Sequence, residues 1–390
     1  MRRWNRQKTN GVTDARAIVG RVENPFVYAK PVPPDELIDR RHEIDTLLSL
    51  LRGGHNARLS APRRYGKTSL VHKVRAEAER EGSATVYVNF YGILSVEEAV
   101  ARLERGYREL RGPLARWMRG KLTSMRVSVS TPLGALTLGG SSSRPAAEAA
   151  LLELLELPTQ LFERSGERVL VCFDEFQEVL SPRTPLDGAI RSVIEQHYDE
   201  AGYLFAGSHP GMMRALFDDR ERPFYGQARA VPLAPLASED LAEFIGARFE
   251  TAGRDAGDAL GPLLDVARGH PQRAMLLAHF VWERTGRGER ADERTFSDAL
   301  EAVEQELDEA FDRVWRGLTD GERRALAAVV LSGGQPTGSQ ALGAVDVARS
   351  TVVEALVRLR DGGHLADSEG TWHFVDPLFE RCVAQGRLDG

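Results

Sequence analysis

The chain has little cysteine, little lysine and no long hydrophobic run. Only two cysteines occur, Cys172 and Cys382, which excludes a disulfide-built domain and favours a reducing, cytoplasmic location. No stretch approaches the roughly 18 consecutive apolar residues that a membrane-spanning helix needs. The first residues are charged and include no apolar segment of the kind that export signals carry, so the sequence predicts neither export nor membrane insertion.

A general excess of positive charge is also absent. The chain carries 51 basic and 57 acidic residues, a formal net charge of -6, so no overall field would draw it onto nucleic acid. Any contact with DNA must therefore be local. The basic stretch 1–23 is one such place, but its composition is more typical of a flexible, solubilising tail, which we predict there.

What the chain does have is enough length for two or three domains. Its 42% hydrophobic and 28% charged residues are typical of a soluble globular protein. Residues 24–34 contain too many prolines for a helix or an interior strand, so we expect an extended arm there. Leucines at helical spacing then predict a helix over residues 41–51.

Short apolar runs alternate with helical patterns over most of the first half of the chain. This alternation predicts an α/β core over 24–236, with a parallel sheet covered by helices on both faces. The run Val169–Phe173 is apolar without alternation, as a central strand buried on both faces should be. The predicted strands are 57–60, 85–90, 168–174, 203–207 and 230–233.

Three further segments are predicted around this core. Alternation at 126–130 and 134–138 predicts a β-hairpin insertion at about 125–139. After Pro235 the strand patterns stop, and residues 237–318 are predicted to form an α-helical lid. The segment 319–390 reads as three short helices followed by a two-stranded wing, which predicts a C-terminal winged helix-turn-helix.

Residues 61–69 have the composition of a loop that binds nucleotide phosphates. Gly66 permits close approach of the backbone, Lys67 supplies a positive charge for the β- and γ-phosphates, and the Thr68 hydroxyl suits Mg²⁺. The loop also joins a predicted strand to a predicted helix. The nucleotide-binding residues expected from it are Ala61, Pro62, Arg63, Arg64, Tyr65, Gly66, Lys67, Thr68 and Ser69.

A pair of acids follows the most apolar predicted strand. Asp174 is expected to hold the Mg²⁺ together with Thr68, and Glu175 to orient or deprotonate the attacking water. Paired with the upstream loop, these acids predict an ATPase that hydrolyses its nucleotide and does not merely bind it. The cofactors implied are ATP and Mg²⁺.

Further candidates follow later strands and helices. Ser208, or else His209, is expected beside the γ-phosphate, although a serine that caps a turn would explain the same pattern. Arg220, Arg222 and Arg229 are candidates for an arginine that a neighbouring copy delivers to the phosphates. In the lid, Pro271 is expected to pack on the adenine and Arg273 to reach the phosphates, although a plain helix start would also explain them.

Taken together, these residues resemble the archaeal-type ATPases of the STAND group within the AAA+-like P-loop ATPases. The resemblance covers roughly residues 24–383. It implies that the arm around Ile38 and Arg40 frames the adenine, and that the protein acts as an ATP-dependent switch. The motifs that carry it are residues 31–44, Pro62-Arg-Arg-Tyr-Gly-Lys-Thr-Ser69, Phe173-Asp-Glu-Phe-Gln177, Ala206-Gly-Ser-His209, Pro223-Phe-Tyr-Gly226, Gly269-His-Pro271 and His373-Phe-Val-Asp-Pro-Leu-Phe379.

Two positions depart from the family pattern. Ala61 replaces a glycine, which is tolerable because a residue before proline is extended and alanine adopts that conformation without strain. Gln227 stands where the family has an arginine, so Arg222 or Arg229 would have to act as the finger.

Three functions remain open on the sequence. One is an ATP-hydrolysing switch that changes its domain arrangement or its homo-oligomeric state between ATP and ADP. Another is a DNA-handling initiator or transposition regulator that uses the winged helix. The last is a nucleotide-stabilised scaffold with negligible turnover. Residues 320–390 hold seven arginines and ten acids, so the winged helix is better suited to a protein client than to duplex DNA.

Overall fold

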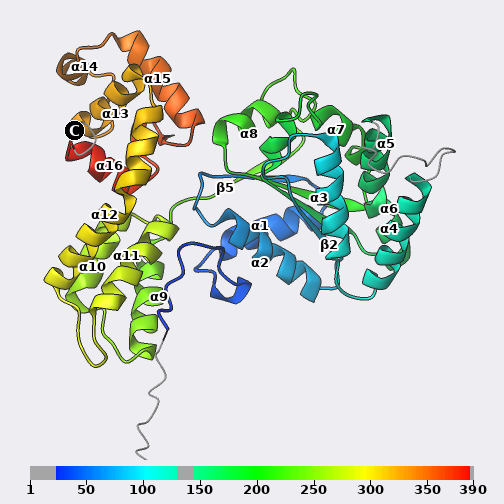
Figure 1. Cartoon of the computed structure of the whole chain (residues 1–390), viewed down its shortest axis with the longest axis horizontal. Coiled ribbons are helices and arrows are strands. Elements are labelled where there is room, and N and C mark those ends of the chain that lie inside the picture. Colours follow the sequence, from blue (N-terminus) through cyan, green and yellow to red (C-terminus); the bar gives the residue numbers. More distant parts are fainter. Residues whose placement is uncertain (1–22, 130–143, 387–390) are drawn as a thin grey trace, which may run out of the picture.

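A computed structural model describes residues 23–129 and 144–386 of the chain, and Figure 1 shows their arrangement. A five-stranded sheet lies at the centre of one half of the molecule. Its strands are all parallel and follow the order β2-β3-β4-β1-β5. Their bounds are β1 Ala57–Ser60, β2 Thr85–Asn89, β3 Val169–Asp174, β4 Ala201–Gly207 and β5 Arg229–Pro232, close to the predicted runs.

Helices cover both faces of the sheet, which confirms the predicted α/β class. All six residues of β3 are buried, and successive ones point to opposite faces. Cys172 packs among the residues of α1 (Arg41–Arg52) and α2 (Lys67–Arg80) on one face. Phe173 packs on the other face. The helices that contribute to that second cluster are α3 Val96–Arg108, α4 Ala115–Val129, α5 Arg144–Leu155, α6 Leu157–Ser165, α7 Asp187–Ile194 and α8 Pro210–Phe217.

The predicted β-hairpin insertion is wrong where it can be examined. Residues 126–129, expected in its first strand, belong to α4. The buried residues Met118, Leu122 and Met125 recur at helical spacing, so the apolar face of α4 extends the helix through the short alternating run. The rest of the predicted insertion falls in 130–143, outside the described residues.

The other half of the molecule is helical (Figure 1). Four helices, α9 to α12, form what we call the lid: α9 Ser238–Thr251, α10 Leu260–Ala267, α11 Pro271–Arg284 and α12 Glu293–Gly317. The C-terminal unit follows as α13 Asp320–Ser332, α14 Ser339–Val345, α15 Arg349–Asp361, the antiparallel strands β6 Leu365–Ser368 and β7 Thr371–Phe374, and α16 Pro377–Ala384. Three helices and a two-stranded wing form the predicted winged helix-turn-helix.

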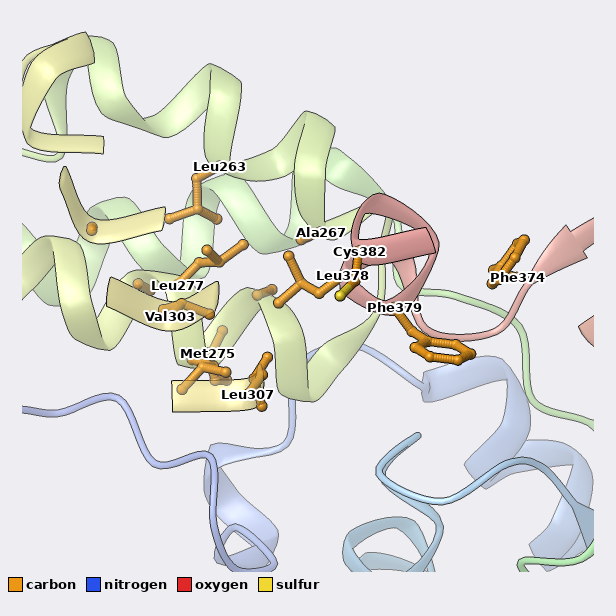
Figure 2. Packing of buried hydrophobic residues seen from close by; sticks show 14 of the residues in the cluster. Leu263, Ala267, Met275, Leu277, Val303, Leu307, Phe374, Leu378, Phe379 and Cys382 are labelled. Atoms are coloured by element: carbon orange, nitrogen blue, oxygen red, sulfur yellow. The ribbon is translucent and has the colours of Figure 1, made fainter. Parts of the chain in front are cut away.

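The lid and the C-terminal unit share one hydrophobic core. Leu378 and Cys382 of α16 belong to the same buried cluster as Ala267 and Leu277 of the lid, and Figure 2 shows them side by side. The N-terminal arm joins this cluster through Phe26, which is 2% exposed. The two units are therefore packed as one body. No helix in residues 23–129 and 144–386 has the length and apolar character needed to cross a membrane.

Candidate nucleotide-binding site

The loop between β1 and α2 is shaped to receive an anion. Gly66 has a φ of 84° and directly precedes α2, and Arg64 in the same loop has a φ of 69°. A Cβ at Gly66 would meet no atom within 4 Å, so the left-handed backbone and not crowding favours glycine there. The first N–H groups of a helix lack intrahelical partners, and here they lie at the carboxyl end of a central parallel strand.

Lys67 is buried in this loop, with 5% of its surface exposed. Its ammonium donates a hydrogen bond to the Pro62 carbonyl at 3.2 Å. Burial lowers the pKa of Lys67, while the nearby carboxylates of Glu175 and Asp174 act to raise it. An anion placed at the loop would compensate the cost of burying this ammonium.

Asp174 and Thr68 lie together at the end of β3. The Thr68 hydroxyl donates to Asp174 Oδ2 at 3.0 Å, and the Tyr87 hydroxyl donates to the same oxygen at 2.9 Å. The Glu175 backbone N–H donates to Asp174 Oδ1 at 3.0 Å. A buried carboxylate beside a hydroxyl offers the hard oxygen ligands that Mg²⁺ prefers, so these residues fit the predicted cation.

Glu175 adopts a left-handed backbone conformation, with a φ of 51°. Its Oε2 accepts hydrogen bonds from the Gln177 amide at 2.6 Å and from the Ser208 hydroxyl. The sheet order explains this meeting, because β4 lies between β1 and β3 and Ser208 directly follows β4. His209, the alternative to Ser208, does not line the cavity described below, and its Nδ1 has no partner within the described residues.

A cavity of about 410 Å³ extends from the loop towards the arm and the lid. Lys67, Thr68, Glu175 and Ser208 line one part of it. Apolar residues from the arm, the β5–α9 connection and the lid also line it, among them Ile38, Leu236, Phe244, Pro271 and Met275. The arm is tied to the loop because the Val32 N–H donates to the Ser69 hydroxyl at 3.1 Å. A polar region continuous with an apolar one suits a nucleotide.

Most of the predicted binding residues line this cavity. Arg40 also does so, and it is held by Glu43 at 2.9 Å and by the Ala234 carbonyl at 2.7 Å. The other predicted residues along its wall are Ile38, Arg63, Arg64, Tyr65, Gly66, Lys67, Thr68, Ser69, Glu175, Ser208 and Pro271. Eight residues named as candidates are outside the lining: Ala61, Pro62, Asp174, His209, Arg220, Arg222, Arg229 and Arg273.

None of the three candidate finger arginines, Arg220, Arg222 and Arg229, lines the cavity of its own chain. Arg222 approaches the buried Asp187 at 3.5 Å. Arg229 is exposed and is the first residue of β5. It lies at the amino ends of the strands, whereas the phosphate loop lies at their carboxyl ends. Contact between any of them and a nucleotide would therefore require a second copy of the chain.

Arg273 does not reach towards the phosphate loop as predicted. It is 1% exposed, and its guanidinium donates to both carboxylate oxygens of Asp376, with Nε at 2.9 Å from Oδ1. Asp376 caps α16 of the C-terminal unit. Burial acts to raise the pKa of Asp376, but the hydrogen bonds and charge of Arg273 outweigh it and hold that pKa below its usual value. The predicted contact of Arg273 with the phosphates is absent in this conformation because the Asp376 carboxylate binds its guanidinium group.

Tyr65 connects the phosphate loop to both other units. Its ring packs edge-on against His270 of the lid, with centroids 4.8 Å apart, and its hydroxyl lies 3.5 Å from the Val375 carbonyl of the C-terminal unit. Burial, and then the charge of Arg273, lower the pKa of Arg64 in the same loop. The loop, the lid and the C-terminal unit therefore meet at one junction.

Sequence reasoning missed three residues of the site. Gln177 and Tyr87 bind the two acids, and Asp376 binds Arg273. Strand alternation could have indicated that Tyr87 and Asn89 share a face with the end of β3, whereas no local signal links Asp376 to a helix 103 positions earlier.

Comparison with known proteins identifies the fold. No protein-family model matches the chain, and no curated protein sequence matches it. The Walker-type ATPase PABY2304 of Pyrococcus abyssi has a similar structure, with a TM-score of 0.64 and 16% identity over 92% of this chain and 99% of that one. The ORC2 protein of Aeropyrum pernix, in ADPNP–ADP complexes, follows with a TM-score of 0.56 and 16% identity over 94% and 99%. The chain thus has the fold of P-loop ATPases that carry a helical lid and a C-terminal winged helix.

Proposed function

We propose that this protein is a Mg²⁺-ATP-hydrolysing switch of the STAND type, in which the nucleotide sets the position of the lid and winged helix. The observation that carries the proposal is the contact of Tyr65, in the phosphate loop, with both His270 and the Val375 carbonyl. Phosphates bound at this loop would alter the surface on which the other two units rest. The adenine-nucleotide complexes of the similar ORC2 fold support the choice of ligand.

Each residue has a defined part in the proposed reaction. Lys67 and the N–H groups at the start of α2 hold the phosphates, while Ile38, Arg40 and Pro271 enclose the base. Thr68 and Asp174 would hold Mg²⁺, which neutralises charge on the phosphates when bound. Glu175 receives the proton of the attacking water. Ser208 and Gln177 fix its carboxylate towards the cavity.

The switch follows from competition for two arginines. Asp376 supplies the negative charge beside Arg273, its charge acts to raise the pKa of Arg64, and the γ-phosphate would supply a second negative charge. The Arg273 Nη1 is buried and has no hydrogen-bond partner in the described part of the chain, so it has capacity for a further acceptor. A ligand that takes Arg273 from Asp376 favours a different arrangement of the lid and winged helix.

Hydrolysis and binding should be measured together on the wild type and Glu175→Gln. We expect the wild type to hydrolyse ATP, and the variant to bind a fluorescent ATP analogue equally well with hydrolysis reduced at least 100-fold, on the scale of a lost catalytic base. Light scattering during turnover would report any change of mass. Equal hydrolysis by the two proteins would rule out the role of Glu175.

A nucleotide-stabilised scaffold is the second candidate. It is favoured by the position of Arg222 and Arg229, since neither lines the cavity of its own chain. ATPase assays over a range of protein concentrations separate the two candidates. Specific activity that rises with concentration indicates an arginine delivered by a second copy, whereas binding without turnover at every concentration indicates the scaffold.

A further inference from the structure

The helices α3 and α4 carry a local excess of positive charge that the nucleotide site does not use. Residues 96–125 hold seven basic and four acidic residues, a net charge of +3 within a chain whose net charge is -6. In Figure 1, α3 lies over the sheet and α4 lies on the side of this half that faces away from the C-terminal unit. The positive charge is therefore concentrated at one place on an acidic protein.

Four of the seven basic side chains form neither an ion pair nor a side-chain hydrogen bond within the described residues. Glu109 binds Arg105 at 2.9 Å and Glu104 binds Arg108 at 2.8 Å, while Arg102 donates to the Tyr91 carbonyl at 3.2 Å. No ion pair or side-chain hydrogen bond within 23–129 and 144–386 engages the other four. They are Arg111, Arg116, Arg119 and Lys121, which we call the basic turn.

The local structure presents the basic turn to solvent. Arg111 lies in the turn between α3 and α4, which Gly112 closes with a φ of 79°. Arg116 and Arg119 are three residues apart and share one side of α4. Met118 and Leu122 hold the opposite side of that helix in the core, at 0% and 2% exposure. The three arginines are all exposed, and Lys121 is half-exposed.

The winged helix, the expected place for nucleic acid, offers far less free positive charge. Arg358 of α15 binds Glu322 at 3.2 Å and approaches Glu354 at 3.9 Å, and Arg360 binds Asp361 at 3.4 Å. The end of α15 also packs against α8, because a Cβ at Gly211 would lie 2.9 Å from the Asp361 Cα. Two of its three arginines, Arg358 and Arg360, are thus paired with acids, Arg349 is exposed, and one end of the helix is covered.

We propose that the basic turn binds the phosphate backbone of duplex DNA, independently of the winged helix. Guanidinium groups bind phosphate oxygens through two parallel hydrogen bonds, which favours arginine at such a surface. Trp117, the aromatic residue between Arg116 and Arg119 in the chain, is half-buried, with the Arg164 guanidinium 4.3 Å from its ring centroid. The basic turn would therefore bind the phosphate backbone of the DNA without contacts that distinguish one base sequence from another.

The test measures the salt dependence of binding by the full chain without nucleotide, so that it does not depend on ATP turnover. The probe is a fluorescent 30-base-pair duplex of arbitrary sequence. Four phosphate contacts predict a slope of roughly -3.6 for the logarithm of the association constant against the logarithm of salt concentration. The variant Arg111→Glu/Arg116→Glu/Arg119→Glu should lose at least tenfold in affinity at low salt and have a slope of about -1.

Two further variants make the result specific. Arg349→Glu/Arg358→Glu/Arg360→Glu changes the net charge by the same amount on α15 and should alter affinity by less than twofold. Arg111→Gln/Arg116→Gln/Arg119→Gln should weaken binding in the same direction, and an unchanged melting temperature would show that the fold persists. The proposal is overturned if the wild type binds no duplex at low salt, if the α15 variant loses as much affinity as the first variant, or if anionic vesicles bind the basic turn and the duplex does not.

Discussion

Arg273 on α11 and Asp376 at the start of α16 form a two-pronged ion pair that joins the lid to the winged helix. The guanidinium is 1% exposed, so its charge depends on this carboxylate for compensation. Removal of one partner from a buried pair leaves the other uncompensated, which costs far more than the pair itself contributes.

We therefore expect Asp376→Ala to lower the free energy of unfolding by about 3 kcal/mol without nucleotide. ATP should raise the melting temperature of this variant by more degrees than that of the wild type, because the phosphates become the partner of Arg273. Glu380→Ala is the matched control. It removes an ion pair with Arg268 between the same two units, which is partly exposed and should contribute less than about 1 kcal/mol. Equal ATP stabilisation of Asp376→Ala and wild type would argue against the competition.

His270 should make stability depend on pH. Burial lowers the pKa of His270 to about 4, and its Nδ1 accepts the Arg273 backbone N–H at the start of α11. The unfolded chain binds this proton below a pH of about 6.5, whereas the folded chain stays neutral until the lower value. The free energy of unfolding that neutral His270 contributes is therefore fully present above about pH 6.5. It is lost as the pH falls from there, by up to about 3 kcal/mol near pH 4.

The variant His270→Asn tests this pH dependence. Asparagine accepts the same capping hydrogen bond but does not titrate. Urea unfolding from pH 7 to pH 4.5 should show a shallower decline than in the wild type. The exposed His55, changed to asparagine, should leave the decline unaltered. Parallel declines in wild type and His270→Asn would exclude His270 as the source.

Tyr87 should position Asp174 for the cation. Its hydroxyl donates to the same oxygen that accepts from Thr68, so Tyr87→Phe leaves Asp174 with one fewer donor. Loss of a ligand's supporting hydrogen bond typically weakens metal binding by about 10-fold or more. We expect a higher Mg²⁺ concentration for half-maximal binding of a fluorescent ATP analogue, with little change in affinity without Mg²⁺. Tyr198→Phe, at a side chain that is 77% exposed, is the control.

Gly211 should set how closely the winged helix docks on the sheet-containing half. A Cβ there would lie 2.6 Å from the Asp361 Cβ and 2.9 Å from its carbonyl oxygen, so Gly211→Ala must push α8 and α15 apart. The radius of gyration from X-ray scattering should rise. Gly246→Ala in α9 meets no atom within 4 Å and should stabilise the protein by roughly 0.5–1 kcal/mol without a change of dimensions. An unchanged radius in Gly211→Ala would contradict the tight docking.

Local sequence patterns predicted the strands and loops that form the site, but they did not predict which side chains far apart in the sequence form ion pairs. The five strands were predictable because each is a short apolar run, and Lys67, Asp174 and Ser208 converge because parallel strands end at one edge. The alternation at 126–130 predicted a strand wrongly, because the longer apolar face of α4 stabilises a helix that continues through residue 129. The ion pair of Arg273 with Asp376 depends on tertiary packing, to which sequence spacing gives no guide.

The single hydrophobic core of lid and winged helix also has a mechanical consequence. Because the two units share buried residues, the movement proposed above would carry them together about the short connection from β5 to α9. Figure 1 shows α13 and α14 in the part of the C-terminal unit that lies away from the phosphate loop. In the proposed switch, a small rotation near Tyr65 would displace these two helices further than it displaces the lid, so a client bound there would respond to the nucleotide without contacting it.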